Sequence, residues 1–124
     1  MNQRVLVVDD EPQFLRALST NLRGAGYDVD TAATAADALS TAPLRPPDAI
    51  ILDLLLSGSD GSAICRRLKE EPQTQEIPVI MISAHPQAKA EAAESGADGF
   101  VAKPFSIAEL LAEIKRHIGE AETA

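Results

Sequence analysis

The sequence is poor in aromatic residues and contains a single cysteine. Its 124 residues include no tryptophan, one tyrosine and three phenylalanines, so a packed core must be mainly aliphatic. One cysteine cannot form an internal disulfide, which fits a protein of the reducing cytosol. We therefore expect a cytoplasmic protein whose core is built from aliphatic side chains.

Long apolar segments and positive charge are also scarce. No apolar run approaches the roughly 20 residues of a membrane span, and residues 1–4 lead directly into an apolar run, leaving no room for a signal peptide. The formal net charge of −8 argues against non-specific nucleic-acid binding, which needs a basic surface. The length is that of one ordinary domain. We expect that domain to bind neither membranes nor nucleic acids directly.

Four short apolar runs each end abruptly in a polar residue. They are residues 5–8 before Asp9 and Asp10, 50–52 before Asp53, 79–82 before Ser83, and 100–102 before Lys103. Short unbroken apolar runs between helical patterns indicate buried strands of a parallel sheet, and ligands bind at the carboxyl ends of such strands. We therefore expect three aspartates, a hydroxyl and a lysine to gather at one edge of the sheet.

Helical patterns alternate with the apolar runs along the chain. We expect five strands, at about 4–8, 27–31, 48–52, 77–82 and following Gly96. We also expect five helices: one at about 12–23, a short second one capped by Thr34, a third that ends at about residue 70, a fourth at about 87–95, and a fifth capped by Ser106. This alternation predicts an α/β fold, a doubly wound three-layer sandwich of five βα units. Pro43, Pro46 and Pro47 should force an extended loop. The helix at 87–95 has only alanines to bury, so it should be weakly anchored.

The predicted acidic edge has the chemistry of a divalent metal site that accepts a phosphoryl group. Asp9 and Asp10 repel each other, and a divalent cation removes that cost. Mg²⁺ uses one or two carboxylates and often a phosphate oxygen. Asp53 adds a carboxylate, and a metal would shield its charge if it is the nucleophile. Lys103 offers a compact positive charge to the same oxygens, and Ser83 can donate a hydrogen bond to a phosphoryl oxygen.

These strand-end residues match a known family in both order and spacing. The chain resembles the receiver domain of two-component response regulators over nearly its full length. The matching stretches are residues 7–11, 53–61, 82–84, 96–100 and 103–105. The resemblance implies a flavodoxin-like fold with a five-stranded parallel sheet of order 2-1-3-4-5. We expect a receiver domain at residues 1–119, followed by a short acidic tail or linker stub at 120–124.

The resemblance also implies a role for each acidic residue. Asp53 takes a phosphoryl group from a phosphohistidine on a sensor histidine kinase or a histidine phosphotransfer protein. Asp10 and Asp53 coordinate Mg²⁺ directly, and Asp9 acts largely through water. The backbone carbonyl of Leu55 completes the protein ligands.

Further residues are implied to bind the phosphoryl group or transmit its presence. Lys103 pairs with the phosphoryl group and precedes a cis bond to Pro104. Ser83 moves to bind a phosphoryl oxygen, and Phe100 then turns inward, which changes the face formed by the fourth helix, the fifth strand and the fifth helix. His85 lies near the mouth of the site and is either a plain loop residue or a modulator of water access to the phospho-aspartate.

The chain departs from the family pattern in three places. Ser57 stands where the family usually has proline, and Phe100 replaces the commoner tyrosine. The stretch between Ser83 and Gly96 is about two residues shorter than the family pattern leads us to expect. The shortened stretch contains the predicted helix at 87–95, which forms part of the face expected to change on phosphorylation.

The favoured hypothesis is a signalling module that catalyses only its own phosphorylation and dephosphorylation. One alternative is an aspartyl-phosphate phosphatase or another Mg²⁺-dependent hydrolase, but no insertion is long enough to form a cap over a substrate. The other is an inert receiver-like scaffold, against which the intact acidic set argues. The sequence leaves the downstream protein partner open.

Overall fold

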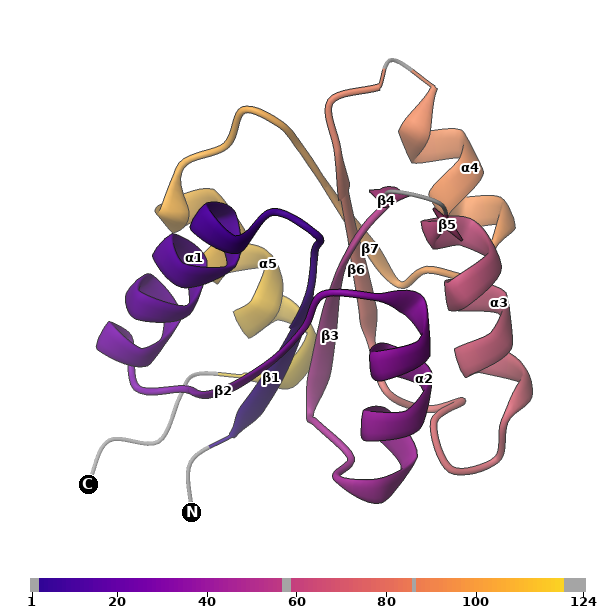
Figure 1. Cartoon of the computed structure of the whole chain (residues 1–124). Helices are drawn as coiled ribbons and strands as arrows, with labels where there is room; N and C mark the ends of the chain where they lie inside the picture. The colour runs from indigo at the N-terminus through magenta and orange to yellow at the C-terminus, as the bar shows by residue number, and fades with distance from the viewer. Residues whose placement is uncertain (1–2, 57–58, 86, 120–124) are drawn as a thin grey trace.

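Five parallel strands form the central layer of the molecule (Figure 1). In the computed structural model, which describes residues 3–56, 59–85 and 87–119, the strands are β1 (Arg4–Val8), β2 (Asp28–Ala32), β3 (Ala49–Asp53), β6 (Val79–Ser83) and β7 (Gly99–Ala102). Their order is β2-β1-β3-β6-β7, which confirms the predicted doubly wound, flavodoxin-like fold. Ser57 and the tail at 120–124 lie outside the described residues.

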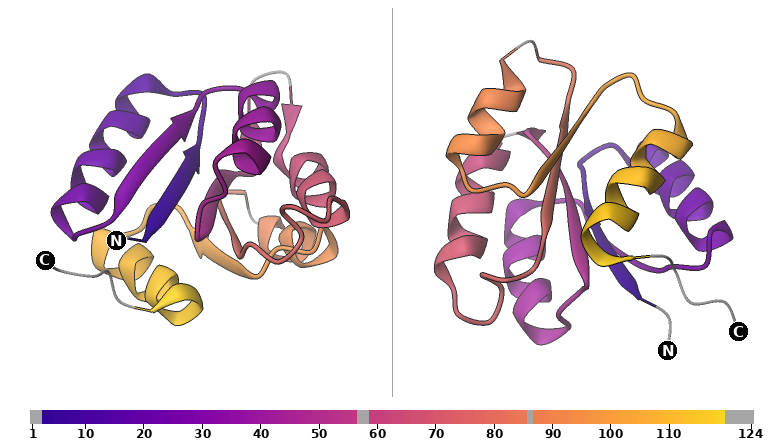
Figure 2. Two further views of the ribbon diagram at one scale, coloured as in Figure 1. Left: turned by 90° about the horizontal axis from the view of Figure 1, so that it is seen from below. Right: turned by 180° about the vertical axis from the view of Figure 1, so that it is seen from behind.

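Helices cover both faces of the sheet, as the views in Figures 1 and 2 show. One face carries α1 (Pro12–Gly24) and α5 (Ile107–Ile118); the other carries α2 (Ala35–Leu44), α3 (Gly61–Glu70) and α4 (Ala88–Glu94). Successive strand residues point to opposite faces, so Leu6 and Val8 join an aliphatic cluster beneath α2, α3 and α4. Val5 and Val7 join a second cluster beneath α1 and α5. Within the described residues, no helix has the length and apolar character needed to cross a bilayer.

The five helices differ in how firmly they are capped and buried. Ser106 and Glu109 form a capping box at the start of α5, and the Thr34 hydroxyl accepts a hydrogen bond from the Asp37 backbone N–H at 3.1 Å, as expected for an N-cap. By contrast, α4 has seven residues, no side-chain cap, and only Ala88 and Ala92 buried. The helix next to β6 and β7 therefore has the least apolar area holding it to the sheet.

One loop prediction was wrong, and several boundaries shifted. Pro43 was expected in an extended loop but lies inside the last turn of α2. A proline there removes one backbone donor, while Ala42 remains fully buried and the Arg45 N–H still closes the turn on the Thr41 carbonyl at 2.9 Å. The helix therefore continues to Leu44, because burial offsets a single lost hydrogen bond.

Two of the strands that lead to the predicted site, β3 and β6, end one residue later than expected, whereas β1 has the predicted bounds. Asp53 pairs with Ile82, and Ser83 pairs with Ala102, so both polar residues still belong to the sheet. After β3 the chain makes a small antiparallel hairpin of β4 (Leu55–Leu56) and β5 (Ser59–Asp60), which the sequence did not indicate. The polar residues of the predicted site are thus held by strand pairing.

The two ends of the described chain meet at the pole opposite the carboxyl ends of the strands (Figure 1). The side-chain amide of Gln3, just before β1, donates to the Ile118 carbonyl at the end of α5. The Tyr27 hydroxyl donates to the Gly119 carbonyl at 3.2 Å. These contacts fasten the last turn of α5 beside the first residues of β1.

A glycine allows α3 to begin close against the end of β3. The Gly61 N–H donates to the Leu54 carbonyl at 2.7 Å. A Cβ at Gly61 would lie 2.3 Å from the Asp53 carbonyl oxygen and 2.7 Å from the Leu54 Cα. Both obstacles are backbone atoms, so they cannot be displaced by a rotamer change. The position of the Asp53 peptide therefore depends on the absence of a Cβ atom at Gly61.

Gly61→Ala should lower the free energy of unfolding by about 2 kcal/mol or more, because the added methyl group forces backbone apart. The matched control is Gly24→Ala at the end of α1, where a Cβ would have nothing within 4 Å. That control should leave the stability unchanged or raise it by about 0.5 kcal/mol through helix propensity. Urea denaturation of the three proteins measures both effects. Equal stabilities for the two variants would contradict the proposed close approach.

Candidate functional site

Strand register brings two buried carboxylates side by side. Val8 pairs with Leu52 across β1 and β3, so the residues that follow them, Asp9 and Asp53, are neighbours at the same edge. Asp9 is 1% exposed and Asp53 is 7% exposed. The Asp9 backbone N–H also donates to the Ala32 carbonyl at 3.1 Å, which continues the pairing of β1 with β2. The sheet thus fixes the two carboxylates in place.

One lysine ammonium serves both carboxylates. The Nζ atom of Lys103 donates to the Oδ2 atom of Asp53 at 2.9 Å and lies 3.8 Å from the Oδ2 atom of Asp9. The Lys103 backbone N–H donates to the Ser83 carbonyl at 2.9 Å, which carries the pairing of β6 and β7 one residue further. The peptide bond from Lys103 to Pro104 is cis. The charge balance of the pocket therefore rests on the end of β7.

Of the two carboxylates, that of Asp9 has the fewer interactions that stabilise its negative charge. Its Oδ1 atom accepts a hydrogen bond from the Glu11 N–H at 2.9 Å, but its buried Oδ2 atom has no hydrogen-bond partner among the described residues. Burial raises the pKa of Asp9 to about 6; the Glu11 N–H opposes the rise and the Asp53 carboxyl group adds to it. The negative charge on Asp9 is therefore costly as the site stands.

This environment fits a divalent cation. Within residues 3–56, 59–85 and 87–119, no three histidine, cysteine or acidic side chains are gathered closely enough to hold a metal by themselves. Mg²⁺ does not require such a cage, because it keeps several waters and binds through one or two carboxylates. The orphaned Oδ2 atom of Asp9 supplies an unsatisfied acceptor beside Asp53. Asp10 lies half-buried at the same edge, and the Leu55 backbone follows in β4.

Ser83 and His85 connect the site to the start of α4. The buried Ser83 hydroxyl accepts a hydrogen bond from the His85 backbone N–H at 3.0 Å. The exposed His85 ring accepts one at its Nδ1 atom from the Gln87 N–H at 3.2 Å. Phe100 is half-buried in β7 and packs against the cluster beneath α2, α3 and α4. A movement of the Ser83 hydroxyl would therefore disturb the turn that leads into α4.

Two aromatic residues at the site were missed by the sequence reasoning. The Lys103 ammonium lies 4.5 Å from the centre of the Phe14 ring, a cation–π contact. Phe105 meets Phe14 edge to face, with ring centres 6.3 Å apart. The sequence placed Phe14 only within the helix predicted at about 12–23. No signal in the linear sequence marks it, because it approaches Lys103 across the gap between α1 and the turn before α5.

Asp9→Asn should stabilise the protein in buffer that contains a chelator. The fold disfavours the charged form of Asp9, so its ionisation lowers the free energy of unfolding increasingly as the pH rises from about 4 to about 6, and the full loss persists above that pH. The shift corresponds to a gain of roughly 1–2 kcal/mol at neutral pH, discounted for water access. Asp28→Asn is the control, because that side chain is exposed on the edge strand. Thermal melts at pH 5 and 8 measure the difference, and a gain that is equal for both variants would refute the assignment.

The chain is similar to known proteins in both sequence and fold. A family model described as the response regulator receiver domain matches residues 5–115. The transcriptional regulator RpaA of Synechocystis sp. is 40% identical over 114 residues, which cover 90% of this chain and 47% of the relative. PhoP of Bacillus subtilis is 38% identical over 126 residues, which cover 100% and 52%. The chain thus spans about half the length of these curated relatives.

Two solved structures extend the comparison. A response regulator from Chloroflexus aurantiacus is 36% identical, with a TM-score of 0.91 over 97% of this chain and 100% of that one. The receiver domain of sensor histidine kinase PA1611 from Pseudomonas aeruginosa is 29% identical, with a TM-score of 0.89 over 97% and 100%. That second structure is described with a magnesium ion coordinated in its active-site cleft.

Proposed function

The chain belongs to the response regulator receiver domain family, and we propose that Asp53 is its phosphoacceptor. The donor is a phosphohistidine on a sensor histidine kinase or a histidine phosphotransfer protein. One observation carries this proposal: the Lys103 ammonium bonds Asp53 beside the orphaned Oδ2 atom of Asp9. Two buried carboxylates that share one cation, with the pKa of one of them raised, form an arrangement typical of functional sites.

In the proposed reaction, a carboxylate oxygen of Asp53 attacks the phosphorus atom. A P–O bond forms as the P–N bond of the donor breaks, and its electron pair stays on the histidine nitrogen. Lys103 exchanges its bond to Asp53 for one to the incoming phosphoryl oxygens. Asp9, Asp10, Asp53 and the Leu55 carbonyl would hold Mg²⁺, which when bound supplies positive charge against the phosphoryl oxygens. The chain thereby catalyses only its own phosphorylation and, with water as the attacking group, its dephosphorylation.

The proposed signal leaves through the turn between β6 and α4. In the unphosphorylated site the Ser83 hydroxyl accepts from the His85 N–H; on phosphorylation it would turn to donate to the phosphoryl group. The His85 backbone then loses its partner, and α4, with only Ala88 and Ala92 buried, is free to shift. Phe100 fills the space by turning inward. We also propose that the exposed His85 ring modulates water access to the phospho-aspartate.

The same proposal has consequences for the location, the binding partners and the domain bounds of the chain. We place it in the cytoplasm, where kinase and phosphotransfer partners would reach it. Its net charge of −8 makes direct nucleic-acid contact by this domain unfavourable. We assign residues 1–119 to the receiver domain. Any DNA-binding or catalytic output would come from a separate protein or a separate domain.

Acetyl phosphate with Mg²⁺ should add one alkali-labile phosphoryl group, and Asp53→Asn should abolish it. Asp28→Asn, which removes an exposed acid far from the site, should label normally. Intact-mass spectrometry measures the added mass, and chelation of Mg²⁺ should prevent the labelling. Full labelling of the Asp53→Asn variant would refute the assignment. Steady release of phosphate from a small phosphomonoester would instead favour the hydrolase alternative.

Beryllofluoride with Mg²⁺, standing in for the phosphoryl group, should change amide exchange most in residues 83–105. The α1 helix should change little, because Leu18 and Leu22 hold it against the sheet. In Ser83→Ala the amide signature of beryllofluoride binding at β1 and β3 should persist while the response of α4 shrinks. Hydrogen exchange followed by mass spectrometry resolves these regions. A full α4 response in that variant, or one centred on α1, would mean that the signal takes another route.

A further inference from the structure

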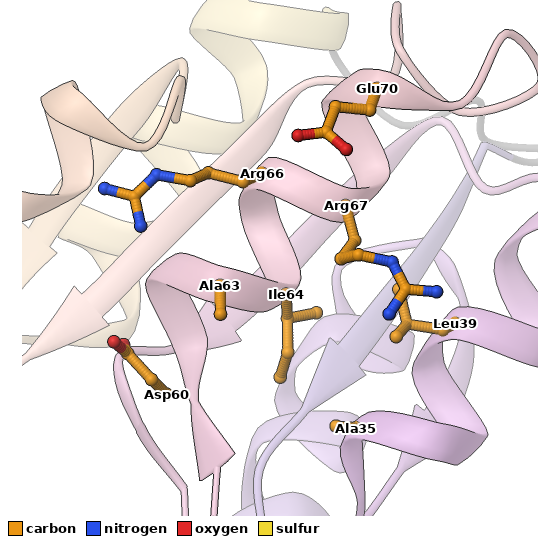
Figure 3. Close-up of a pocket in the computed structure, with 8 residues that line it drawn as sticks. All are labelled: Ala35, Leu39, Asp60, Ala63, Ile64, Arg66, Arg67 and Glu70. Carbon is orange, nitrogen blue, oxygen red and sulfur yellow. The ribbon is translucent and has the colours of Figure 1, made fainter.

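A groove of about 430 Å³ lies between α2 and α3 (Figure 3). Leu39 lines it from α2, together with four charged side chains from the start of α3 onward. Asp60 and Glu70 balance the charges of Arg66 and Arg67, so the lining has no net charge that would select a ligand. None of the residues assigned to the phosphoryl site lines this groove, whereas a second hollow borders that site directly.

The second hollow has a volume of about 360 Å³ and lies beside the end of β7. It is lined by Phe14, Ala84, Lys103, Pro104 and Phe105. Lys103 is the one charged residue of this lining, and its side chain is 26% exposed. A lysine stem is long and flexible, so the hollow offers the ammonium a position away from Asp53.

Few contacts hold the Lys103 ammonium at Asp53. Within the described residues, its side chain makes one hydrogen bond, to the Asp53 Oδ2 atom at 2.9 Å. The Asp9 Oδ2 atom, at 3.8 Å, is beyond hydrogen-bond distance. In the proposed reaction Lys103 gives up its bond to Asp53. The hydrogen bond that now places the ammonium is therefore lost when the phosphoryl group arrives.

The Phe14 ring provides a contact that survives this exchange. The Lys103 Nζ atom lies over the ring, 4.5 Å from its centre, where the negative face of the aromatic ring attracts a cation. That attraction does not depend on the direction of one N–H bond. The ammonium has three donors, so it can turn from Asp53 to a phosphoryl oxygen while it stays over the ring.

The Phe14 ring is itself held by packing. Phe14 lies in the first turn of α1 and packs against the aliphatic cluster beneath α1 and α5. The Phe105 ring meets it at an interplanar angle of 86° with the ring centres 6.3 Å apart, a favourable arrangement for two aromatic rings. The orientation of the ring face therefore depends on these neighbours as well as on Lys103.

We propose that Phe14 is a positioning residue for phosphoryl transfer. Its ring keeps the Lys103 ammonium over the site while the ammonium exchanges Asp53 for the phosphoryl oxygens. Without the attraction of the ring face, the ammonium would spend more time in the neighbouring hollow, and phosphorylation would slow. This inference rests on the proposed function of Asp53 and adds a residue that makes and breaks no covalent bond.

The test replaces Phe14 with phenylalanines that carry one, two or three ring fluorines, introduced by nonsense suppression. Fluorine withdraws charge from the ring face and weakens the cation–π attraction, while the ring keeps nearly the same size. Labelling by acetyl phosphate with Mg²⁺ should slow with each added fluorine, by about fivefold for three. Phe14→Leu should be slowed to a similar degree. Phe14→Tyr, which keeps an aromatic face, should label at nearly the original rate.

A second measurement follows the ammonium in the presence of a chelator and without a phosphoryl donor. In a chain labelled with ¹³C-lysine, the ε-methylene protons of Lys103 should resonate upfield of those of the exposed Lys89 and Lys115, because of the ring beneath. With three fluorines at Phe14 they should move toward the exposed-lysine values, while the melting temperature stays unchanged. An unchanged labelling rate across the series, or a slower rate without movement of these signals, would overturn the proposal.

Leu15→Ala is the control for packing. Leu15 is half-buried on the same helix and packs against the same cluster, so this variant should melt at a lower temperature but label at the original rate. Equal slowing of Leu15→Ala would assign the effect to the packing of α1 and overturn the role of Phe14. Failure of the unsubstituted chain to label, or labelling of Asp53→Asn, would instead refute the proposed function, and this inference with it.

Discussion

The site depends on the register of two neighbouring strands. Because β1 and β3 pair with Val8 opposite Leu52, the next residues place two carboxylates together where water is excluded. Several neighbouring groups compensate for the repulsion between these two carboxylates. The Lys103 ammonium reaches both acids, and one acid remains undercompensated, with its pKa raised to about 6. Such a pocket is poised to gain free energy from any positive charge that enters it.

The two sides of this pocket differ in how strongly packing and hydrogen bonds hold them. On one side, Lys103 lies over the Phe14 ring, which packs edge to face against Phe105, and α5 begins with a capping box. On the other, Ser83 is joined through a single hydrogen bond to the turn before α4. The seven-residue α4 buries only small side chains. A charge change at the centre would therefore be absorbed on the α4 side, where rearrangement breaks the fewest contacts.

The sequence allowed the fold and the members of the acidic edge to be predicted, because apolar runs ending in Asp9, Asp53, Ser83 and Lys103 encode both strand burial and strand polarity. Local rules failed where burial outweighed them, as at Pro43, which stays helical while its neighbour Ala42 is buried. The cation–π contact of Phe14 and the groove beside Leu39 could not be foreseen. Each joins residues from separate helices or loops, and only packing determines such neighbours.

The contact of Gln3 with Ile118 has a consequence for how this unit combines with others. Since both ends emerge at one pole, the whole fold can be inserted into a surface loop of another protein, or cut and rejoined as a circular permutant, without pulling the sheet apart. A domain attached at this pole would lie on the side of the sheet opposite the acidic edge and would leave that edge accessible. The curated relatives, in which the matched stretch is about half of a longer chain, are compatible with such modular use. The placement of the two ends therefore lets the same fold be joined to different neighbouring domains without a change in its sheet.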